Sequence, residues 1–188
     1  MKNIVLLVLL LGLVGCAGAR NIPVDRATLP MLKGKSLSLV SHESPSFVAM
    51  TSGKGMFAVA GVGAAVAAGN QLVVDDQIAD PARKISQLLA KNLNSGLGLV
   101  LNDQESKKSA SKDMAEILKL TAESDYALDV LTNGWSFIYD GFKFSEYIVG
   151  YSVKMRLIDV ASSKAIAEGF CAYDTKSAGK PNVSYEKL

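Results

Sequence analysis

Side chains that commonly perform catalysis or bind metals are sparse in this sequence of 188 residues. It contains one histidine, His42, and two cysteines, Cys16 and Cys171. A zinc site needs several histidine, cysteine or carboxylate ligands. The groups of a serine hydrolase must converge in space, whereas here serine, histidine and glutamate only follow one another along residues 41–44. We therefore expect no catalytic residues, no metal and no cofactor, and a hydrolase is only the third functional hypothesis.

Two further polar motifs have simpler local explanations. Asp75, Asp76 and Asp80 could bind a divalent cation, but they lack the regular oxygen spacing of a calcium loop. A solvated turn and a helix cap at Asp80 explain them. The glycines and lysine of residues 53–55 lack the upstream glycine and the following hydroxyl residue of a phosphate-binding loop.

Three other groups of side chains are expected to serve the fold. Cys171 stands between Phe170 and Ala172 and is expected to be a small buried hydrophobe. Asp125 and Asp129 share one strand face and are expected to be exposed. The alternating aromatic residues could form a recognition patch, but such residues more often build a sheet core; they are Trp135, Tyr139, Tyr147 and Tyr151.

Cys16 is the one residue whose surroundings predict a specific modification. An apolar run over residues 4–14 follows the single cation Lys2 and ends in Leu13-Val14-Gly15-Cys16. A charged start, a short apolar stretch and a small residue before the cut are typical of a secretory signal peptide. The run is too short for a transmembrane helix, which needs about 20 residues. The order Leu-Val-Gly-Cys resembles the lipobox of bacterial lipoproteins.

The lipobox resemblance implies a lipid anchor. In that family the cysteine thiol is diacylated, the peptide is cut before the cysteine, and the new amino terminus is acylated, so Cys16 would carry the lipid, palmitate included. Two or more acyl chains anchor stably, at about 0.8 kcal/mol per buried methylene. The resemblance also implies the periplasmic side of the outer membrane rather than the inner membrane, because Ala17 and not aspartate follows the cysteine. The alternative is an ordinary signal peptide that contains Cys16 by chance.

A second unusual stretch contains no charged residue from position 56 to position 74. Gly61, Ala65 and Gly69 are spaced four apart, which on a helix stacks small residues on one face and permits close approach of another backbone. Three structures remain open for residues 53–74: a helix packed on the sheet, a mobile loop, or a segment that self-associates or touches the membrane. We favour packing or a loop, because a helix over residues 56–69 would be about 21 Å long, short of a hydrocarbon core of about 30 Å.

Composition and charge describe one globular domain behind the signal. The chain has 20 basic and 18 acidic residues, and its net charge of +2 argues against broad nucleic-acid binding. We expect a signal peptide over residues 1–15, the lipidated cysteine with a flexible tether over 16–34, one domain over 35–175, and a polar tail over 176–188. The last four residues predict the start of a helix, and we expect the given chain to stop early in it.

Apolar periodicity predicts an α+β domain with a mixed sheet of about four to five strands. A helix begins at Asp80 and ends at Gly96, and a second covers residues 111–123; both are expected on one face of the sheet. Strands are expected at residues 36–41 and 98–101. From residue 124 the period is two, with a parity change at Gly134 that predicts a bulge. A turn at Asp140-Gly141 and strands to residues 157 and 174 complete an antiparallel meander.

The mature domain resembles a second lipoprotein family. Residues 151–169 are similar to the paired strands of the curli-export and penicillin-binding-protein-activator lipoproteins, in which a strand that ends in an Asp-containing turn returns with a small, apolar strand that ends in Gly. The helix at Asp80 and the strand at Asp125 fit the same order. The resemblance implies an α/β fold and carries over no site. The transmembrane hairpins of the curli exporter have no clear counterpart here.

The leading functional hypothesis is a lipid-anchored, non-enzymatic envelope protein that acts as a periplasmic binding or assembly-accessory domain. Its partners would be the membrane, through Cys16, and an envelope protein or a second copy of itself. The alternative is a membrane-inserting or pore-associated oligomer that uses residues 53–74, with Gly61, Ala65 and Gly69 as its contact residues.

Overall fold

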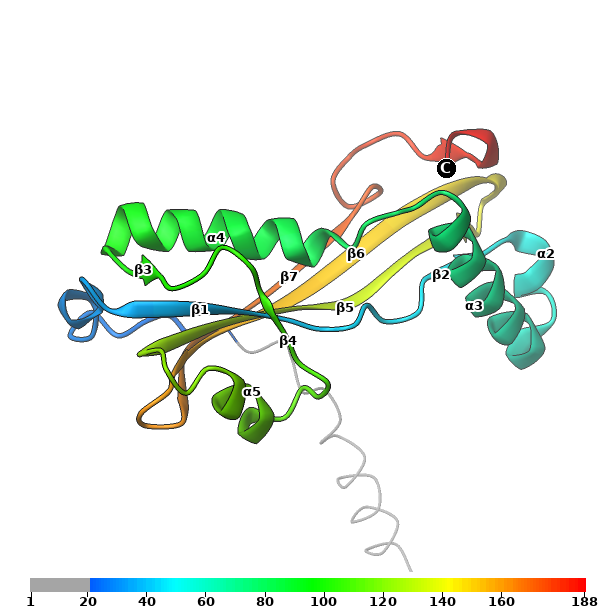
Figure 1. Cartoon of the computed structure of the whole chain (residues 1–188). Helices are drawn as coiled ribbons and strands as arrows, with labels where there is room; N and C mark the ends of the chain where they lie inside the picture. Colours follow the sequence, from blue (N-terminus) through cyan, green and yellow to red (C-terminus); the bar gives the residue numbers. More distant parts are fainter. Residues whose placement is uncertain (1–20) are drawn as a thin grey trace, which may run out of the picture.

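The fold is a long mixed sheet with helices on both faces (Figure 1). The computed structural model describes residues 21–188, apart from the side chains of residues 58 and 187. Neighbouring strands follow the order β3-β1-β5-β6-β7, and β2 and β4 extend the parallel part on β5 and β1. This arrangement confirms the predicted α+β class. The strands are β1 (Ser36–Ser41), β2 (Val48–Met50), β3 (Val100–Leu101), β4 (Lys107–Lys108), β5 (Tyr126–Asp140), β6 (Lys143–Asp159), β7 (Lys164–Asp174) and β8 (Val183–Ser184).

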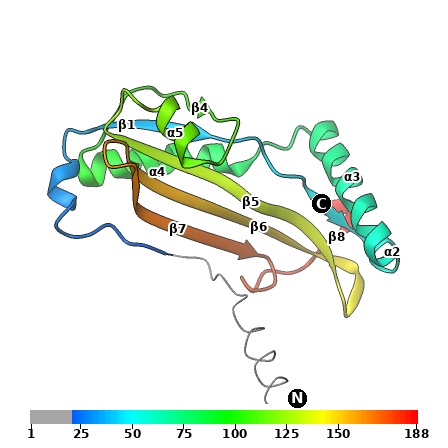
Figure 2. The same ribbon diagram turned by 90° about the horizontal axis from the view of Figure 1, so that it is seen from below.

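The antiparallel meander of β5, β6 and β7 is the longest part of the sheet (Figure 2). Pairing between β5 and β6 shifts between Thr132 and Gly134, which leaves Asn133 without a partner in the ladder. The predicted bulge is therefore confirmed, and it is the reason that apolar residues change parity along β5. A tight turn follows Asp140, where the backbone N–H of Phe142 donates to the Asp140 carboxylate.

Helix α4 (Pro81–Leu97) and helix α5 (Met114–Leu120) lie on opposite faces of the sheet (Figure 1). Leu39 faces α4, whereas its neighbour Val40 faces α5 and packs against Ile117. The expectation that both helices cover one face is wrong, because alternate side chains of one strand point to opposite sides. Two consecutive buried apolar residues on β1 therefore require a cover on each side.

The ends of α4 follow helix-capping rules. The Asp80 side chain accepts from the backbone N–H of Ala82 at 2.9 Å, which confirms the predicted cap. The helix continues through Gly96 and ends at Leu97, because Gly98 takes the left-handed conformation with φ of 75°. The predicted end at Gly96 is therefore wrong by one residue, and the glycine that terminates the helix is Gly98.

Both segments that flank the domain pack against it. Ile22 bridges to Glu168 of β7, and Leu32, in the short helix η1 (Leu29–Leu32), is fully buried. Near the other terminus β8 pairs with β6, and the ring of Tyr185, in η2 (Tyr185–Lys187), contacts Tyr147. The expectation of a flexible tether over residues 16–34 is therefore wrong for residues 22–32, and the polar tail expected over residues 176–188 is attached to the sheet at residues 183–185. Apolar residues within these polar segments hold them to the sheet.

Candidate functional site

The predicted lipid-anchor residues Leu13, Val14, Gly15 and Cys16 lie outside the described residues. The anchor therefore stays a prediction from sequence. Among the residues that the structure describes, no helix is long and apolar enough to cross a membrane.

The uncharged stretch forms a helix rather than a loop. Helix α2 (Ser52–Gly55) leads directly into α3 (Ala58–Asp75), and the pair stands at one end of the molecule, beside β2 and the far end of β5 (Figures 1 and 2). The backbone N–H of Phe47 donates to the Asn70 side chain at 3.0 Å, which ties α3 to the segment that leads into β2.

The predicted contact residues of this segment face the protein's own backbone. A β-carbon at Gly61 would overlap the carbonyl oxygen of Lys54, and one at Gly69 would overlap the carbonyl oxygen of Phe47. Ala65, between them on the same face, is fully buried. The small residues thus permit α2 and the chain before β2 to approach α3 closely, and in this structure the inner stripe is occupied by the chain itself.

The outer face of α3 is apolar and uncovered. The side chain of Val59 is 86% exposed and that of Val62 is 49% exposed. Gly63, Ala64 and Ala67, which continue the same side, are also exposed. A surface helix normally carries polar or charged residues toward water, so an exposed helix face without charge is typical of an interaction surface.

The apolar surface continues through aromatic side chains at the β5–β6 turn. The ring of Tyr139 lies where a β-carbon of Gly55 would be, and it stacks on Phe144 with ring centroids 6.0 Å apart. Phe142 is 93% exposed at the tip of the turn. We call this surface the apolar end; its exposed large residues are Met56, Phe57, Val59, Val62, Phe142 and Phe144.

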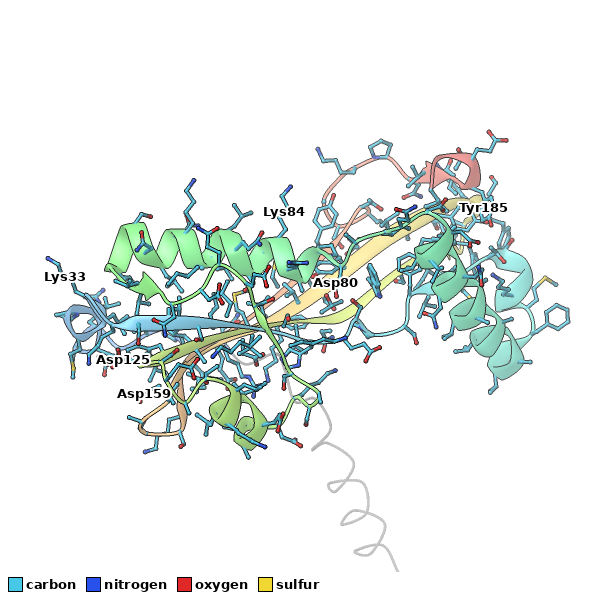
Figure 3. All side chains as sticks on the ribbon, viewed as in Figure 1. Lys33, Asp80, Lys84, Asp125, Asp159 and Tyr185 are labelled. Carbon is cyan, nitrogen blue, oxygen red and sulfur yellow. The ribbon has the colours of Figure 1, made fainter. Side chains whose placement is uncertain are left out.

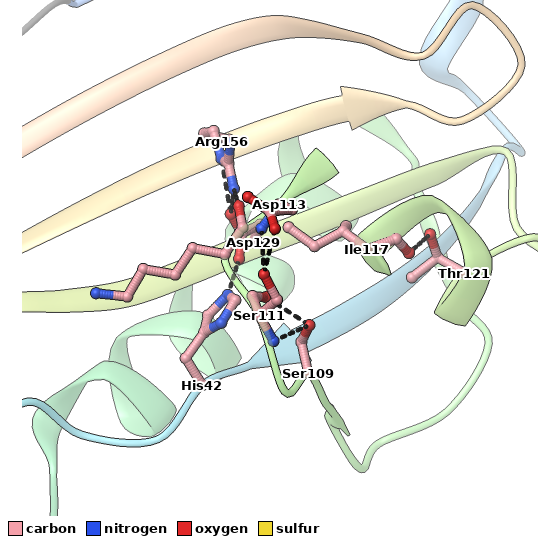
Figure 4. Close-up of polar contacts among 9 residues, drawn as sticks. His42, Ser109, Ser111, Asp113, Ile117, Thr121, Asp129 and Arg156 are labelled. Atoms are coloured by element: carbon pink, nitrogen blue, oxygen red, sulfur yellow. Dashed lines mark hydrogen bonds and ion pairs between the residues drawn. The ribbon is translucent and has the colours of Figure 1, made fainter. Parts of the chain in front are cut away.

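His42 belongs to a buried polar cluster on the α5 side of the sheet (Figure 4). Its Nε2 contacts one carboxylate oxygen of Asp129, whose side chain is fully buried. Arg156 donates to the other oxygen through Nε at 2.7 Å, and its Nη2 lies 2.6 Å from that oxygen. The expectation that Asp129 is exposed is therefore wrong.

This cluster joins the chain rather than forming a catalytic triad. Asp129 stands opposite Arg156 in the β5–β6 ladder, and His42 follows the end of β1, so three neighbouring strands are linked through one carboxylate. In residues 21–188 no serine hydroxyl hydrogen-bonds to His42, and Ser44 donates instead to Asp80 at 2.7 Å. No group of three or more metal-ligating side chains occurs in that range.

Asp125 holds the start of β1 against the start of β5. Its carboxylate accepts from the backbone N–H and hydroxyl of Ser36, at 2.9 and 2.8 Å, and from Lys35 Nζ at 3.0 Å. The Ser36 backbone N–H, followed by Lys35, lowers the pKa of this carboxyl to about 2. These contacts give Asp125 a structural role: it links the start of β5 to the start of β1.

The remaining predicted residues divide between core and surface. Trp135 and Tyr147 are buried, and the indole N–H of Trp135 donates to the Pro45 carbonyl at 2.8 Å, so the core interpretation is confirmed for both. Cys171 is a free, exposed cysteine, and the expectation that it is buried is wrong. It stands near the end of β7 (Lys164–Asp174).

No protein-family model matches the sequence, and no curated protein matches it. Several solved structures are similar. The LpoB C-terminal domain from Salmonella enterica is 13% identical with a TM-score of 0.37, over 75% of this chain and 83% of that one. The PelC dodecamer from Paraburkholderia phytofirmans is 13% identical with a TM-score of 0.39, over 82% and 79%.

A third similar structure is lipoprotein GNA1162 from Neisseria meningitidis, which is 15% identical with a TM-score of 0.33, over 74% of this chain and 82% of that one. Identities and TM-scores this low assign neither a family nor a function to the chain.

Proposed function

We propose that this chain is a lipid-anchored envelope protein that performs no catalysis itself and docks a helix of another protein chain on the outer face of α3. Its anchor is the acylated Cys16. The observation that carries the docking surface is that α3 has no charged residue from 58 to 74, yet Val59, Val62 and Ala64 are exposed. Covering that face removes apolar area from water, at about 25 cal/mol per Å².

The chemistry of this face suits a helix better than a lipid surface. Gly63 and Ala67, and likewise Ala60 and Ala64, are spaced four apart, so two rows of small residues lie on the exposed side. Such rows permit a second helix to approach closely. A membrane-surface helix instead carries lysine or arginine beside its apolar face. The lysine nearest to α3 in the sequence, Lys54, donates from Nζ to the carbonyl of Ala49 at 3.1 Å.

A second candidate function is membrane contact by an oligomer. Its support is the pair of exposed aromatic residues at the β5–β6 turn, Phe142 and Phe144, because phenylalanine is among the residues that interfacial segments bury in the lipid surface. In this alternative the turn would enter the lipid surface while α3 contacts other copies.

Site-specific photo-crosslinking in intact cells tests the docking surface. A photoreactive side chain at Ala64 is expected to give a discrete protein adduct, either with a second copy or with one partner. The matched control is Ser162, an exposed residue in the β6–β7 turn. An adduct with lipid alone, or the same adducts from both positions, would contradict docking through α3.

Metabolic palmitate labelling tests the anchor separately. The wild-type chain is expected to incorporate label and Cys16→Ser is expected to incorporate none, because the thiol is the acceptor. Cys171→Ser, which removes the exposed cysteine of the described domain, is the matched control and is expected to label like the wild type. Equal labelling of the Cys16→Ser chain would show that Cys16 is not the anchor.

A further inference from the structure

A groove with both polar and apolar lining runs along α4 on the side that faces the loop of residues 102–106. Two cavities of about 370 and 670 Å³ line up there. Both are bounded by Leu39, Gln87 and Gln104, so they adjoin and form one groove, which we call the α4 groove. Cavities of roughly 300–1,000 Å³ are the usual size of small-molecule sites.

One buried hydroxyl in the α4 groove has no hydrogen-bond partner. Ser86 is 3% exposed, and its Oγ is the one buried side-chain polar atom without a partner among the described residues. Ser86 lines the first cavity, between Ala82 and Gln87. Buried polar groups in proteins are nearly always paired, so this hydroxyl is the polar group of the cavity wall that still lacks a partner.

Cationic and amide side chains of α4 line the same side of the groove. Arg83, Gln87 and Lys91 are spaced four apart on α4, and Arg83 lines the first cavity whereas Lys91 lines the second. The two cationic residues are about 12 Å apart along the helix axis. Within the described part of the chain neither makes an ion pair; the pairs there involve Lys35, His42, Lys107, Lys143, Arg156 and Lys176.

The one carboxylate that lines the groove accepts hydrogen bonds from the chain itself. Asp80 lines the first cavity, but one of its oxygens accepts from Ser44 and the other from the hydroxyl of Thr132 and the N–H of Ala82. Its negative charge also lies at the amino-terminal end of α4, where the helix dipole favours it. Among the described residues Asp80 makes no ion pair either, so the lining carries two cationic side chains, Arg83 and Lys91, against one carboxylate, a net charge of +1.

We propose that the α4 groove binds a small, elongated polar molecule that carries at least one carboxylate or phosphate. The anionic group pairs with Arg83, where guanidinium geometry suits both anions. Polar groups of the ligand meet the amides of Gln87 and Gln104 and the hydroxyl of Ser86, and its far end reaches Lys91. This site is separate from the docking face on α3, so either can fail without the other.

Calorimetric titration of the full chain in a non-ionic detergent tests the site with two anionic probes, citrate and inorganic phosphate, and one neutral probe, sorbitol. At least one anionic probe is expected to bind with a dissociation constant of about 1 mM or lower. Tighter binding of citrate identifies a carboxylate ligand, and tighter binding of phosphate identifies a phosphate ligand. Failure of both probes at about tenfold higher concentration would overturn the proposal.

Matched variants separate the α4 groove from general attraction of anions. Arg83→Gln is expected to weaken binding of the preferred probe at least about tenfold. Lys84→Gln removes the same charge from the next residue, which points away from the sheet (Figure 3) and does not line the groove, and is expected to bind like the wild type. Equal loss in both variants would overturn the proposal, as would unchanged binding in Ser86→Ala and Arg83→Gln.

Discussion

At the scale of single residues, Asp129 is the position with the largest expected energetic effect. Its carboxylate is fully buried between His42 and Arg156. Removal of one partner of a buried ion pair leaves the other charge without compensation, at a cost of about 3–5 kcal/mol. Asp129→Asn is expected to lower the free energy of unfolding by an amount of this order, measured by urea titration with Trp135 fluorescence.

The control for Asp129 is a carboxylate without such surroundings. Asp76→Asn changes the same charge at an exposed position after α3 and is expected to alter the free energy of unfolding by less than about 0.5 kcal/mol. Similar unfolding midpoints for both variants would show that the buried cluster contributes little to stability.

The sequence did not predict this cluster because its members are far apart in the chain. His42 and Asp129 are separated by 87 positions. The alternation predicts the strand that carries Asp129, but alternation alone cannot tell whether the second face of a sheet is open or covered. In the structure the consecutive apolar residues Leu39 and Val40 face opposite covers, α4 and α5. The cations of the α4 groove were likewise indistinguishable from an ordinary solvated helix face.

At the scale of elements, α3 uses its glycines in two different ways. Gly69 faces the backbone of Phe47, whereas a β-carbon at Gly63 would meet nothing within 4 Å. Gly69→Ala is expected to destabilise the protein by about 1–3 kcal/mol through overpacking. Gly63→Ala is expected to stabilise it by about 0.5–1 kcal/mol, because alanine restricts the unfolded chain and favours a helix.

Thermal unfolding of the two glycine variants, side by side, checks this assignment. Opposite shifts of the unfolding temperature are the expected result. Shifts of the same sign would mean that α3 is not packed on β2 as the structure has it. The same geometry explains why Gly61 is unsuitable for testing self-association: a larger side chain there would displace Lys54 before it reached any partner.

Apolar periodicity predicts where helices and strands form better than it predicts what they pack against. Strand alternation, the bulge at Asn133 and the span of β7 follow from apolar spacing, which reports local backbone structure directly. Helix α3 has almost no such spacing, because its own apolar and small residues are distributed over all of its faces. The sequence therefore could not choose between a packed helix and a loop, and the choice depends on backbone contacts with residues 47 and 54.

At the scale of the whole molecule, acylation of Cys16 would place the β7 edge of the sheet near a membrane. Cys16 precedes Ile22 by six residues, and Ile22 is fixed to Glu168 of β7. Six residues span at most about 20 Å, so an acylated Cys16 would hold the edge of the sheet close to the lipid surface. The outer face of α3 would then meet partners that are also confined to the envelope.

If the outer face of α3 is covered in the cell, a cysteine on that face reacts slowly with maleimide, and the rate of labelling measures this. Ala64→Cys and Ser162→Cys, each in a Cys171→Ser background, would be labelled in intact membranes and again after purification in detergent. We predict that Cys at position 64 is labelled at least about tenfold more slowly in membranes than after purification, whereas Cys at position 162 is labelled at similar rates in both. Equal rates at position 64 in the two preparations would show that the outer face of α3 is uncovered in the cell.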